Sequence, residues 1–474
     1  MASSRKLKSS SISRKAENVL REQVRPGNRL VVGLSGGVDS VVLLDLLVPL
    51  SIQLQVALSA IHINHGISPH AEQWSHFCHH LCHSRGIPFE IVRLKICRTP
   101  GISLEAAARD ERYRIFATLE ADYVVLAQHL DDQAETLMLQ LLRGAGVKGL
   151  SGMPVVRAGR SGFKALLRQS SEQASESGVL PHPRILRPLL DVSRREIEEY
   201  ALEHALRWMK DESNDNVAFD RNFLRHEFFP LLEKRFPSYR KTFLRASRHI
   251  AEASALMDEL AQADSKECAA SGKIEIECLR QIGFRRAKNL LRYTFAREGA
   301  ILPSAAKLED IVRQLLSNGA SAKLHVTFGD TEIRTFGGLL HLRETSVPPP
   351  IHLRMAWQGE ERVVIAELGG TLTFTPAEGA GISLGRLTEF PVTIRLRSGG
   401  ERLRPDCKRP RRSLKNLLQE AAIPPWERET LPLIFSGEHL ASVPGLGVDC
   451  DFQAAPGEQS LIAHWRPGSD PGCA

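Results

Sequence analysis

Six consecutive residues near the N-terminus carry the groups that a phosphate-binding loop needs: two hydroxyls, two glycines and a carboxylate. They are Ser35, Gly36, Gly37, Val38, Asp39 and Ser40. Glycine lets the backbone approach an anion closely, and a helix that begins here offers N–H groups and a partial positive charge. The lysine of a Walker A loop is absent, while Asp39 is a ligand type that nucleotide-bound Mg²⁺ prefers. The stretch predicts a nucleotide phosphate site; a plain Ser/Gly turn, with Asp39 as a helix-start acid, is the alternative.

A second group of reactive side chains follows at His129, Asp132 and Glu135. In a helix that begins near residue 130, Asp132 and Glu135 fall at i and i+3 on one face. Two carboxylates placed in this way can hold a cationic substrate or accept a proton from an amine. Acids at a helix start can also merely complement the helix dipole, which is the alternative interpretation. We predict catalytic roles for Asp39, His129, Asp132 and Glu135.

Each of these groups follows an apolar run that is typical of a buried strand. Residues 30–34 precede the Ser/Gly loop, residues 122–127 precede the acidic segment, and residues 56–63 and 88–94 predict two more strands. Helical segments lie between them, so we predict an α/β fold with a doubly wound parallel sheet. Because ligands gather at the carboxyl ends of parallel strands, the loop and the acid pair are expected to meet over one pocket.

Arginines supply candidate contacts to phosphate groups or RNA, because their forked guanidinium matches phosphate oxygens. Some lie on a helix face near residue 110, in a glycine-rich loop or at a later helix start, and others lie in the dense basic stretch 408–415. A solvated charged face is the alternative for each. The arginines expected to contact substrate or RNA are Arg109, Arg112, Arg143, Arg194, Arg409, Arg411 and Arg412.

The composition fits a soluble protein of several domains. Of 474 residues, 42% are hydrophobic and 25% charged, and no apolar run approaches the ~20 residues of a membrane span. The net charge of +7 permits a nucleic-acid partner without requiring one. Eight cysteines without a Cys-x-x-Cys pair argue against a disulfide framework and favour the reducing cytoplasm. The Cys- and His-rich helix at 76–83 is expected to be part of the core, with a structural metal as the alternative.

The Ser-Gly-Gly-Val-Asp-Ser loop after a strand resembles that of the ATP pyrophosphatase family. Further motifs resemble, in the same order, those of the tRNA(Ile)-lysidine synthase family: Asn64-His65-Gly66, Arg109 with Arg112-Tyr113, His129 through Thr136, Arg143 through Met153, Arg187 through Leu190, Trp208, and Arg221-Asn222. The sequence departs from the family at Gln128, where another histidine or a glycine is expected, and at Ala145, where serine is usual. Neither departure removes a charged group from the predicted site.

This resemblance implies a doubly wound parallel-sheet ATP pyrophosphatase domain, followed by a helical domain and a small α+β C-terminal domain. We expect a disordered basic leader over residues 1–18 and a catalytic domain over residues 19–222. A connecting helix and a helical tRNA-binding domain are expected over residues 223–346, and a C-terminal tRNA-binding domain over residues 351–474.

The resemblance also implies a reaction, the ATP-dependent ligation of free L-lysine to the wobble cytidine of tRNA(Ile) with a CAU anticodon. The reaction passes through an adenylated cytidine and releases AMP and pyrophosphate. ATP and Mg²⁺ are the implied cofactors, with Asp39 as the metal ligand. The implied partners are tRNA(Ile) and L-lysine, without a membrane; a homodimer and a cytoplasmic location are further expectations. Which acids bind lysine and which bind Mg²⁺ stays open.

Other enzymes with the same loop are the alternatives. A tRNA thiolase would need a persulfide-carrying or cluster-binding set of cysteines near the loop, and Cys78, Cys82 and Cys97 form no obvious set. An ammonia-dependent ligase would leave the basic C-terminal stretch without a purpose. A non-catalytic RNA-binding module is disfavoured by the carboxylates of the predicted site.

Overall fold

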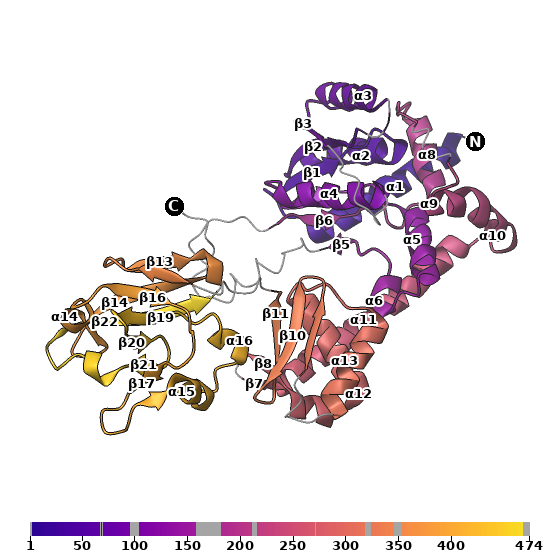
Figure 1. Cartoon of the computed structure of the whole chain (residues 1–474). Coiled ribbons are helices and arrows are strands. Elements are labelled where there is room, and N and C mark those ends of the chain that lie inside the picture. The colour runs from indigo at the N-terminus through magenta and orange to yellow at the C-terminus, as the bar shows by residue number, and fades with distance from the viewer. Residues whose placement is uncertain are drawn as a thin grey trace. The chain divides into compact units, whose positions relative to one another are not determined.

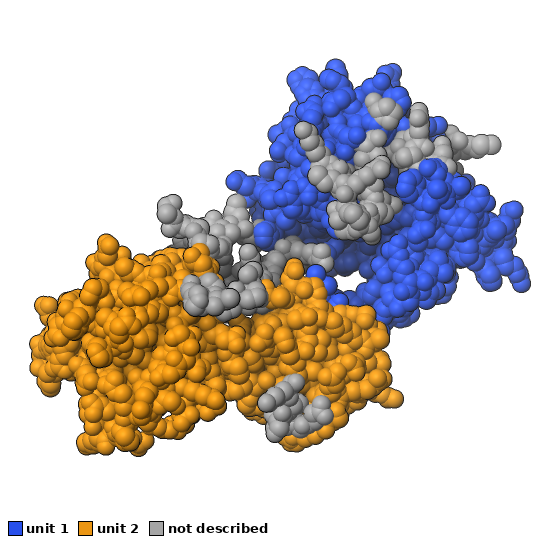
Figure 2. Space-filling view, viewed as in Figure 1, with its two compact units in different colours: residues 1–267, 288–302 blue, residues 268–287, 303–474 orange. Residues whose placement is uncertain are grey.

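The computed structural model describes residues 2–66, 68, 70–94, 104–157, 182–210, 216–270, 272–317, 324–345 and 353–467. The chain divides into two compact units, which Figure 2 shows in different colours. The first comprises residues 1–267 and 288–302, and the second comprises residues 268–287 and 303–474. Each unit has a hydrophobic core of its own.

A six-stranded sheet organises the first unit (Figure 1). Its strands, in spatial order, are β3 (Phe89–Arg93), β2 (Ala57–Asn64), β1 (Arg29–Gly33), β4 (Tyr123–Val125), β6 (Arg184–Leu186) and β5 (Val156–Arg157). The first five pair in parallel, and β5 joins the edge strand β6 antiparallel. The strand order reverses between β1 and β4, which is the topology of a doubly wound sheet. The predicted fold class of this unit is confirmed.

Helices cover both faces of this sheet. On one face, the main core receives side chains from α1 (Ala2–Gln23), α2 (Val38–Gln53), α3 (Ala71–His83) and α8 (Arg194–Glu203). On the other face, α4 (Leu104–Thr118) packs Phe116 against Ile61 and Val124. A sheet that is buried on both faces explains why its strands are continuous apolar runs in the sequence.

The expectation of a disordered leader over residues 1–18 is wrong from Ile12 onward. This segment belongs to the helix α1, in which Ile12, Ala16 and Leu20 are buried. These residues recur at every fourth position, so they form one helical face that packs into the main core. The basic, Ser-rich composition concealed this face, because a composition averages over all sides of a helix.

Further helices complete the first unit and hold the acidic segment in place. They are α5 (Leu130–Leu142), α6 (Val147–Leu150), α9 (Asp220–Phe223), the π-helical turn η2 (Leu224–Phe228), α10 (Phe229–Arg235) and α11 (Tyr239–Glu267). The rings of Phe229 and Tyr239 stack with centroids 5.1 Å apart, in a small core that includes Ala134 and Leu139 of α5. The connecting helices are thereby fastened to α5.

The second unit contains more β-structure than the sequence predicts. A five-stranded antiparallel sheet has the order β7 (Ala269–Ala270), β8 (Lys273–Glu275), β11 (Leu339–Glu344), β10 (Thr331–Phe336) and β9 (His325–Phe328). The same unit contains the helix α13 (Ala305–Ser317) and the part of α12 (Ile276–Arg297) that ends at residue 287. The expected helical domain is therefore corrected to a mixed region. Its strands are short and carry polar residues such as Glu332 and Arg334, which weaken the alternating pattern of a strand.

The C-terminal residues form two larger antiparallel sheets and a two-stranded one of β17 (Arg402–Leu403) and β18 (Arg412–Ser413), as expected of a small α+β domain. One has the order β12 (Arg354–Ala356), β16 (Val392–Arg395), β19 (Leu433–Ser436), β20 (His439–Val443) and β21 (Gly447–Val448). The other has the order β13 (Arg362–Ile365), β14 (Gly370–Glu378), β22 (Gln459–Pro467) and β15 (Ile382–Ser383). The helices of this region are α14 (Leu384–Leu387), α15 (Leu414–Glu420) and α16 (Pro425–Arg428).

Two cysteine pairs of the second unit are joined as disulfides, Cys268–Cys278 and Cys407–Cys450. The expectation that the cysteines form no disulfides is therefore corrected for these two pairs. Their partners are 10 and 43 residues apart, so neither pair has the short spacing on which that expectation relied. Among the described residues, no helix combines the length and the apolar character that crossing a membrane requires.

Candidate active site

The two segments predicted to carry chemistry leave the sheet from neighbouring strands. β1 leads into the Ser/Gly loop and α2, while β4, which pairs with β1, leads to His129 and α5. The order of the strands reverses between them, so their connections diverge at the carboxyl edge. Ligands of doubly wound sheets bind at such a point.

The Ser/Gly loop winds around one hydroxyl group. The Ser40 Oγ accepts hydrogen bonds from the N–H groups of Ser35 and Gly36, each at 3.2 Å, and donates to the carbonyl of Gly37 at 3.0 Å. Gly36 has φ +88°, and a Cβ added there would lie 3.3 Å from the sulfur of Cys78. The turn therefore requires glycine. It delivers the chain to the N-terminus of α2, whose first N–H groups have no acceptor within the helix.

Asp39, the second residue of α2, joins the loop to the acidic segment. Its Oδ2 accepts a hydrogen bond from Nη1 of Arg194, and its Oδ1 lies 3.6 Å from Nε2 of His129. Oδ1 is buried and has no hydrogen-bond partner within the described part of the chain. Burial raises the pKa of Asp39, an effect that His129 and Arg194 oppose. A buried carboxylate oxygen without a partner is suited to binding a cation.

His129 links Asp39 to Asp132. Its imidazole is 3% exposed, and Nε2 lies 3.5 Å from Oδ2 of Asp132. The same oxygen accepts the backbone N–H of His129 at 3.0 Å, so Asp132 also caps the start of α5. The helix-start interpretation of this acid is therefore confirmed, while its catalytic role stays a prediction. The loop and the acidic helix lie at one site.

Glu135, one turn further along α5, is almost completely buried and is paired with Arg225 of η2. The Nε and Nη2 atoms of Arg225 each lie 2.8 Å from Oε1 of Glu135, and Nη2 lies 3.8 Å from Oδ1 of Asp132. The second oxygen of Glu135, Oε2, is buried without a hydrogen-bond partner among the described residues. Burial raises the pKa of Glu135, and Arg225 partly opposes this. Arg225 thus pairs with one oxygen of Glu135 and leaves the other without a donor among the described residues.

Asp131 is a fourth acid of the site that sequence reasoning did not select. It accepts hydrogen bonds from the backbone N–H of Arg194 at 2.8 Å and from Nε of Arg240 in α11. Burial would raise the pKa of Asp131, but these two donors bring it below its ordinary value. Arg240 lies 109 residues after Asp131, and Arg225 lies 90 residues after Glu135. No local pattern in the sequence could therefore have indicated these two arginines as partners.

Gln128, where the sequence departs from the family, has a structural role beside His129. Its side-chain oxygen accepts a hydrogen bond from Nε of Arg187, an arginine that is only 2% exposed. Nη1 of Arg187 donates to the carbonyl of Pro154 at 3.0 Å. The amide of Gln128 therefore helps to satisfy a buried guanidinium at the edge of the sheet.

The remaining predicted arginines of the first unit do not contact Asp39 in the described part of the chain. Arg109 is exposed, with its guanidinium 5.6 Å from the ring centroid of Tyr113. Nη2 of Arg112 lies 3.3 Å from Nε2 of His65. Arg143, at the end of α5, is 63% exposed and lies 3.7 Å from the carboxylate of Asp220.

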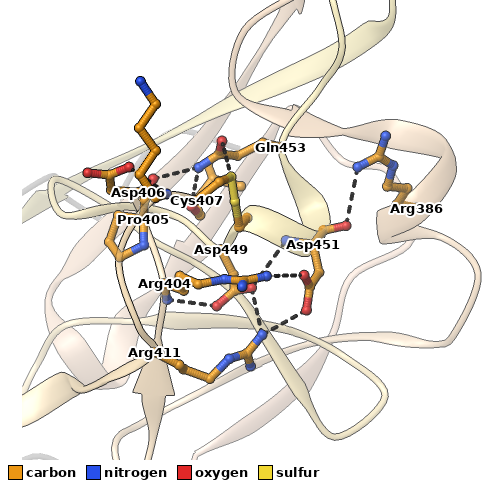
Figure 3. Close-up of a disulfide and its surroundings, with 12 residues drawn as sticks. Arg386, Arg404, Pro405, Asp406, Cys407, Arg411, Asp449, Asp451 and Gln453 are labelled. Atoms are coloured by element: carbon orange, nitrogen blue, oxygen red, sulfur yellow. Dashed lines mark hydrogen bonds and ion pairs between the residues drawn. A yellow bond between two sulfur atoms is a disulfide. The ribbon is translucent and has the colours of Figure 1, made fainter.

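Arg411, predicted to contact RNA, belongs instead to an internal network of the C-terminal domain. Figure 3 shows it beside Arg404 and the Cys407–Cys450 disulfide. Nη2 of Arg411 lies 3.0 Å from Asp449, which is fully buried, and 2.7 Å from Asp451. Arg404 bonds to Asp451 at 2.8 Å. Arg411 therefore compensates a buried carboxylate, a role that its place in a basic run did not indicate.

The other two predicted arginines of this domain are also paired with acids. Arg412 bonds to Glu420, and Nε of Arg409 lies 3.3 Å from the carboxylate of Asp406. The side chain of Arg409 is 72% exposed, whereas that of Arg412 is 32% exposed. Lys408 beside Arg409 is exposed as well. The basic stretch therefore offers Lys408 and Arg409 to a ligand more readily than Arg411 and Arg412.

The cysteines of α3 lie in the main core, next to the Ser/Gly loop. Cys78 and Cys82 are both fully buried, and burial raises their pKa values to about 12 and about 11. Where the chain is described, no group of three or more His, Cys, Asp or Glu side chains is arranged to hold a metal ion. The burial of both cysteines favours the core interpretation of this helix.

The fold and the site define a class, the PP-loop proteins. The family model described as a PP-loop domain matches residues 8–232. Two further models, described as the TilS substrate binding domain and the TilS substrate C-terminal domain, match residues 275–341 and 392–465.

The chain belongs to the tRNA(Ile)-lysidine synthase family and is an enzyme of the ligase class. It is 51% identical over 451 residues to the tRNA(Ile)-lysidine synthase of Nitrosomonas europaea, with 94% of each chain covered. It is 36% identical over 456 residues to that of an Azoarcus species, with 96% of this chain and 95% of the relative covered. PP-loop family membership implies that the enzyme binds ATP.

A tRNA thiolase, the first alternative, is only a distant structural neighbour. The solved U34-tRNA thiolase of Methanococcus maripaludis, with its [4Fe-4S] cluster, is 20% identical with a TM-score of 0.42. That alignment covers 52% of this chain and 80% of the thiolase.

Replacing Arg225 with glutamine should make the stability of the protein more dependent on pH. Without the guanidinium, the pKa of buried Glu135 rises further, so the folded protein keeps a proton that the unfolded chain releases. The free energy of unfolding should therefore fall as the pH rises from about 5 towards neutrality, by about 1–3 kcal/mol more than in the wild type. Urea unfolding across this pH range measures the difference.

Two variants serve as controls for this measurement. Arg195→Gln removes an exposed ion pair to Glu199 and should leave the pH profile unchanged. Glu135→Gln combined with Arg225→Gln removes the titrating carboxyl group and should abolish the added pH dependence. An Arg225→Gln profile parallel to that of the wild type would contradict the inferred pairing.

The C-terminal arginines should separate into structural and RNA-binding residues. Arg411→Gln leaves Asp449 buried with fewer partners and should lower the free energy of unfolding by about 1–3 kcal/mol. Lys408→Gln with Arg409→Gln should change stability by less than about 0.5 kcal/mol but weaken tRNA binding and reduce its salt dependence. Thermal unfolding and binding titrations at several salt concentrations measure the two effects. A stable Arg411→Gln variant with a flattened salt dependence would instead identify Arg411 as an RNA contact.

Proposed function

We propose that this enzyme ligates L-lysine to the wobble cytidine of tRNA(Ile) that carries a CAU anticodon. ATP adenylates the cytosine carbonyl oxygen and releases pyrophosphate, and the lysine ε-amine then displaces AMP from the ring carbon. Support comes from family membership, since a tRNA(Ile)-lysidine synthase is 51% identical over 94% of the chain. The residues at the carboxyl edge of the sheet also suit both steps.

One observation carries this proposal: Nε2 of His129 lies 3.6 Å from Asp39 and 3.5 Å from Asp132. The two steps must act on one base, because AMP leaves from the same ring carbon that the amine attacks. A nucleotide site and an amine site must therefore adjoin. The imidazole of His129 lies between the Ser/Gly loop and the acidic helix, and this arrangement satisfies the geometric requirement.

The loop from Ser35 to Ser40 is proposed to bind the triphosphate at the start of α2. Asp39 is the proposed Mg²⁺ ligand, because its buried Oδ1 has no hydrogen-bond partner in the described chain. Mg²⁺ usually combines one or two carboxylate oxygens with phosphate oxygens and water, which suits a single acid beside a nucleotide. When bound, the ion would stabilise the charge that develops on the departing pyrophosphate. Arg194, on the other oxygen, opposes the protonation of Asp39 that burial favours.

Asp132 and Glu135 are proposed to hold the lysine ε-ammonium group and to accept its proton. An amine attacks only in its neutral form, so a proton acceptor within hydrogen-bond reach is needed. Burial raises the pKa of Glu135, which makes this carboxylate a stronger base than an exposed glutamate. Its Oε2 lacks a hydrogen-bond partner among the described residues, while Oε1 is held by Arg225.

The proposal also covers the remaining expectations from the sequence. Arg109, Arg112, Arg143 and Arg409 are proposed contacts to tRNA. Residues 19–222 are proposed as the catalytic domain, and the regions 223–346 and 351–474 as tRNA-binding domains. The cytoplasm as the compartment and a homodimer as the assembly belong to the same proposal.

The test is a set of reactions with purified enzyme, ATP, Mg²⁺ and a tRNA(Ile) transcript with a CAU anticodon. Pyrophosphate release should require the transcript, and added L-lysine should yield AMP and an RNA heavier by one lysine residue. A matched transcript with uridine in place of the wobble cytidine should give neither product. ATP turnover with ammonia and without RNA would indicate a small-molecule ligase, and sulfur incorporation would indicate a thiolase.

Glu135→Gln should separate lysine binding from ATP binding. Loss of the carboxylate removes a counter-ion and a proton acceptor, so the KM for lysine should rise by ~10-fold or more. The KM for ATP should stay within about twofold of the wild-type value, because Glu135 is not assigned to the nucleotide. Steady-state kinetics with each substrate varied in turn measure both constants, with Glu199→Gln on the exposed side of α8 as the control. Loss of ATP binding would assign Glu135 to the nucleotide instead.

A further inference from the structure

We propose that Phe219 and Phe223 form a platform on which unpaired bases next to the target cytidine stack. The inference rests on the proposed function, because it assumes that a base of the anticodon loop must enter the site. A base leaves its stack to reach such a site, and its former neighbours lose stacking partners. Exposed aromatic side chains next to the site can replace those partners.

The segment that carries the two rings runs antiparallel along the acidic helix α5. At one end, the carboxylate of Asp220 lies 3.7 Å from Arg143, which follows the last residue of α5. At the other end, Arg225 bonds to Glu135 near the start of α5. Phe223 lies in the sequence between Asp220 and Arg225, and Phe219 directly precedes Asp220. Phe223 therefore lies two positions before the arginine that pairs with Glu135, whereas Phe219 lies next to Asp220, at the Arg143 end of α5.

The burial pattern of this segment places the two rings on its outer side. Asn222 and Leu224 are buried, and the side-chain nitrogen of Asn222 donates to the carbonyl of Asn216 at 2.9 Å. Phe219 is 46% exposed and Phe223 is 51% exposed. They are four positions apart, which puts them on one side of a helical turn. Packing therefore fixes the backbone while both aromatic rings face outward.

The charges around the rings favour RNA as the occupant. Arg143 is 63% exposed, and Arg221 lies between the two phenylalanines in the sequence. Arginines interleaved with exposed aromatic rings suit a ligand that has a phosphate backbone and flat bases. Arg143 keeps most of its side chain exposed although Asp220 lies 3.7 Å away, so it can still contact a phosphate group of the RNA. We therefore commit to single-stranded RNA of the anticodon loop.

The experiment uses the full-length enzyme and tRNA(Ile) in which 2-aminopurine replaces the adenosine of the CAU anticodon. Stacking on an aromatic ring quenches 2-aminopurine fluorescence, so the signal reports the environment of the base next to the target cytidine. Phe219→Leu combined with Phe223→Leu keeps apolar bulk but removes both π faces. This variant should bind the tRNA ~10-fold more weakly and lose the additional quenching. The KM values for ATP and lysine should not change.

Matched variants separate stacking from folding. Phe223→Trp keeps an aromatic face and should retain quenching and affinity. Phe236→Leu alters a phenylalanine that is 57% exposed but lies outside α9, and it should behave as the wild type. Thermal unfolding of every variant identifies any loss of folded protein, and the single variants Phe219→Leu and Phe223→Leu provide the same readout if the double variant does not fold.

Unchanged quenching and affinity in the leucine variants would overturn the platform, even if the enzyme makes the proposed product. A wild type that makes no product with the unmodified tRNA(Ile) would overturn the proposed function, while the 2-aminopurine signal would still test the platform. Weakened binding to a protein partner with intact RNA binding would assign the two rings to a protein interface, against our inference.

Discussion

Charge compensation between buried carboxylates and arginines from distant segments is the interaction on which the site depends. The acids are Asp39, Asp131, Asp132 and Glu135, and the arginines are Arg194, Arg225 and Arg240. Four carboxylates in one place would repel each other and would resist burial unless cations were paired with them. Two carboxylate oxygens of this group have no hydrogen-bond partner in the described chain. They are Asp39 Oδ1 and Glu135 Oε2. In the proposed function, those two oxygens are the ones that would bind Mg²⁺ and the ammonium group of lysine.

Because of this pairing, both the sheet and the connecting helices contribute residues to the site. The loop and α5 come from the sheet, but Arg225 and Arg240 come from η2 and α11. Stacking of Phe229 on Tyr239 fastens those helices to α5, so packing and charge compensation support each other. The exposed residues Phe219, which caps α9, and Phe223, which ends it, belong to the same segment as Arg225. An RNA that contacts them would therefore bind next to a residue that orients Glu135.

The C-terminal domain shows that a dense run of basic residues is not the same as a basic surface. Arg411 turns toward Asp449 and Asp451, and Arg412 toward Glu420. These acids lie outside the basic run in the sequence. A count of the charges within that run therefore overestimates the positive potential at the surface. Lys408 and Arg409 keep their side chains largely exposed. The positive surface of this domain therefore comes from fewer residues than the composition indicates.

The sequence by itself determined the parts that depend on near neighbours in the chain. The strand, the glycine turn and the helix around Asp39 follow from local patterns, as does the i, i+3 placement of Asp132 and Glu135. Tertiary structure alone decided that α1 is buried through Ile12 and Leu20 and that Glu135 is paired with Arg225. Partners separated by 90 or 109 residues leave no periodic signal, because burial and ion pairing are set by where folded segments meet.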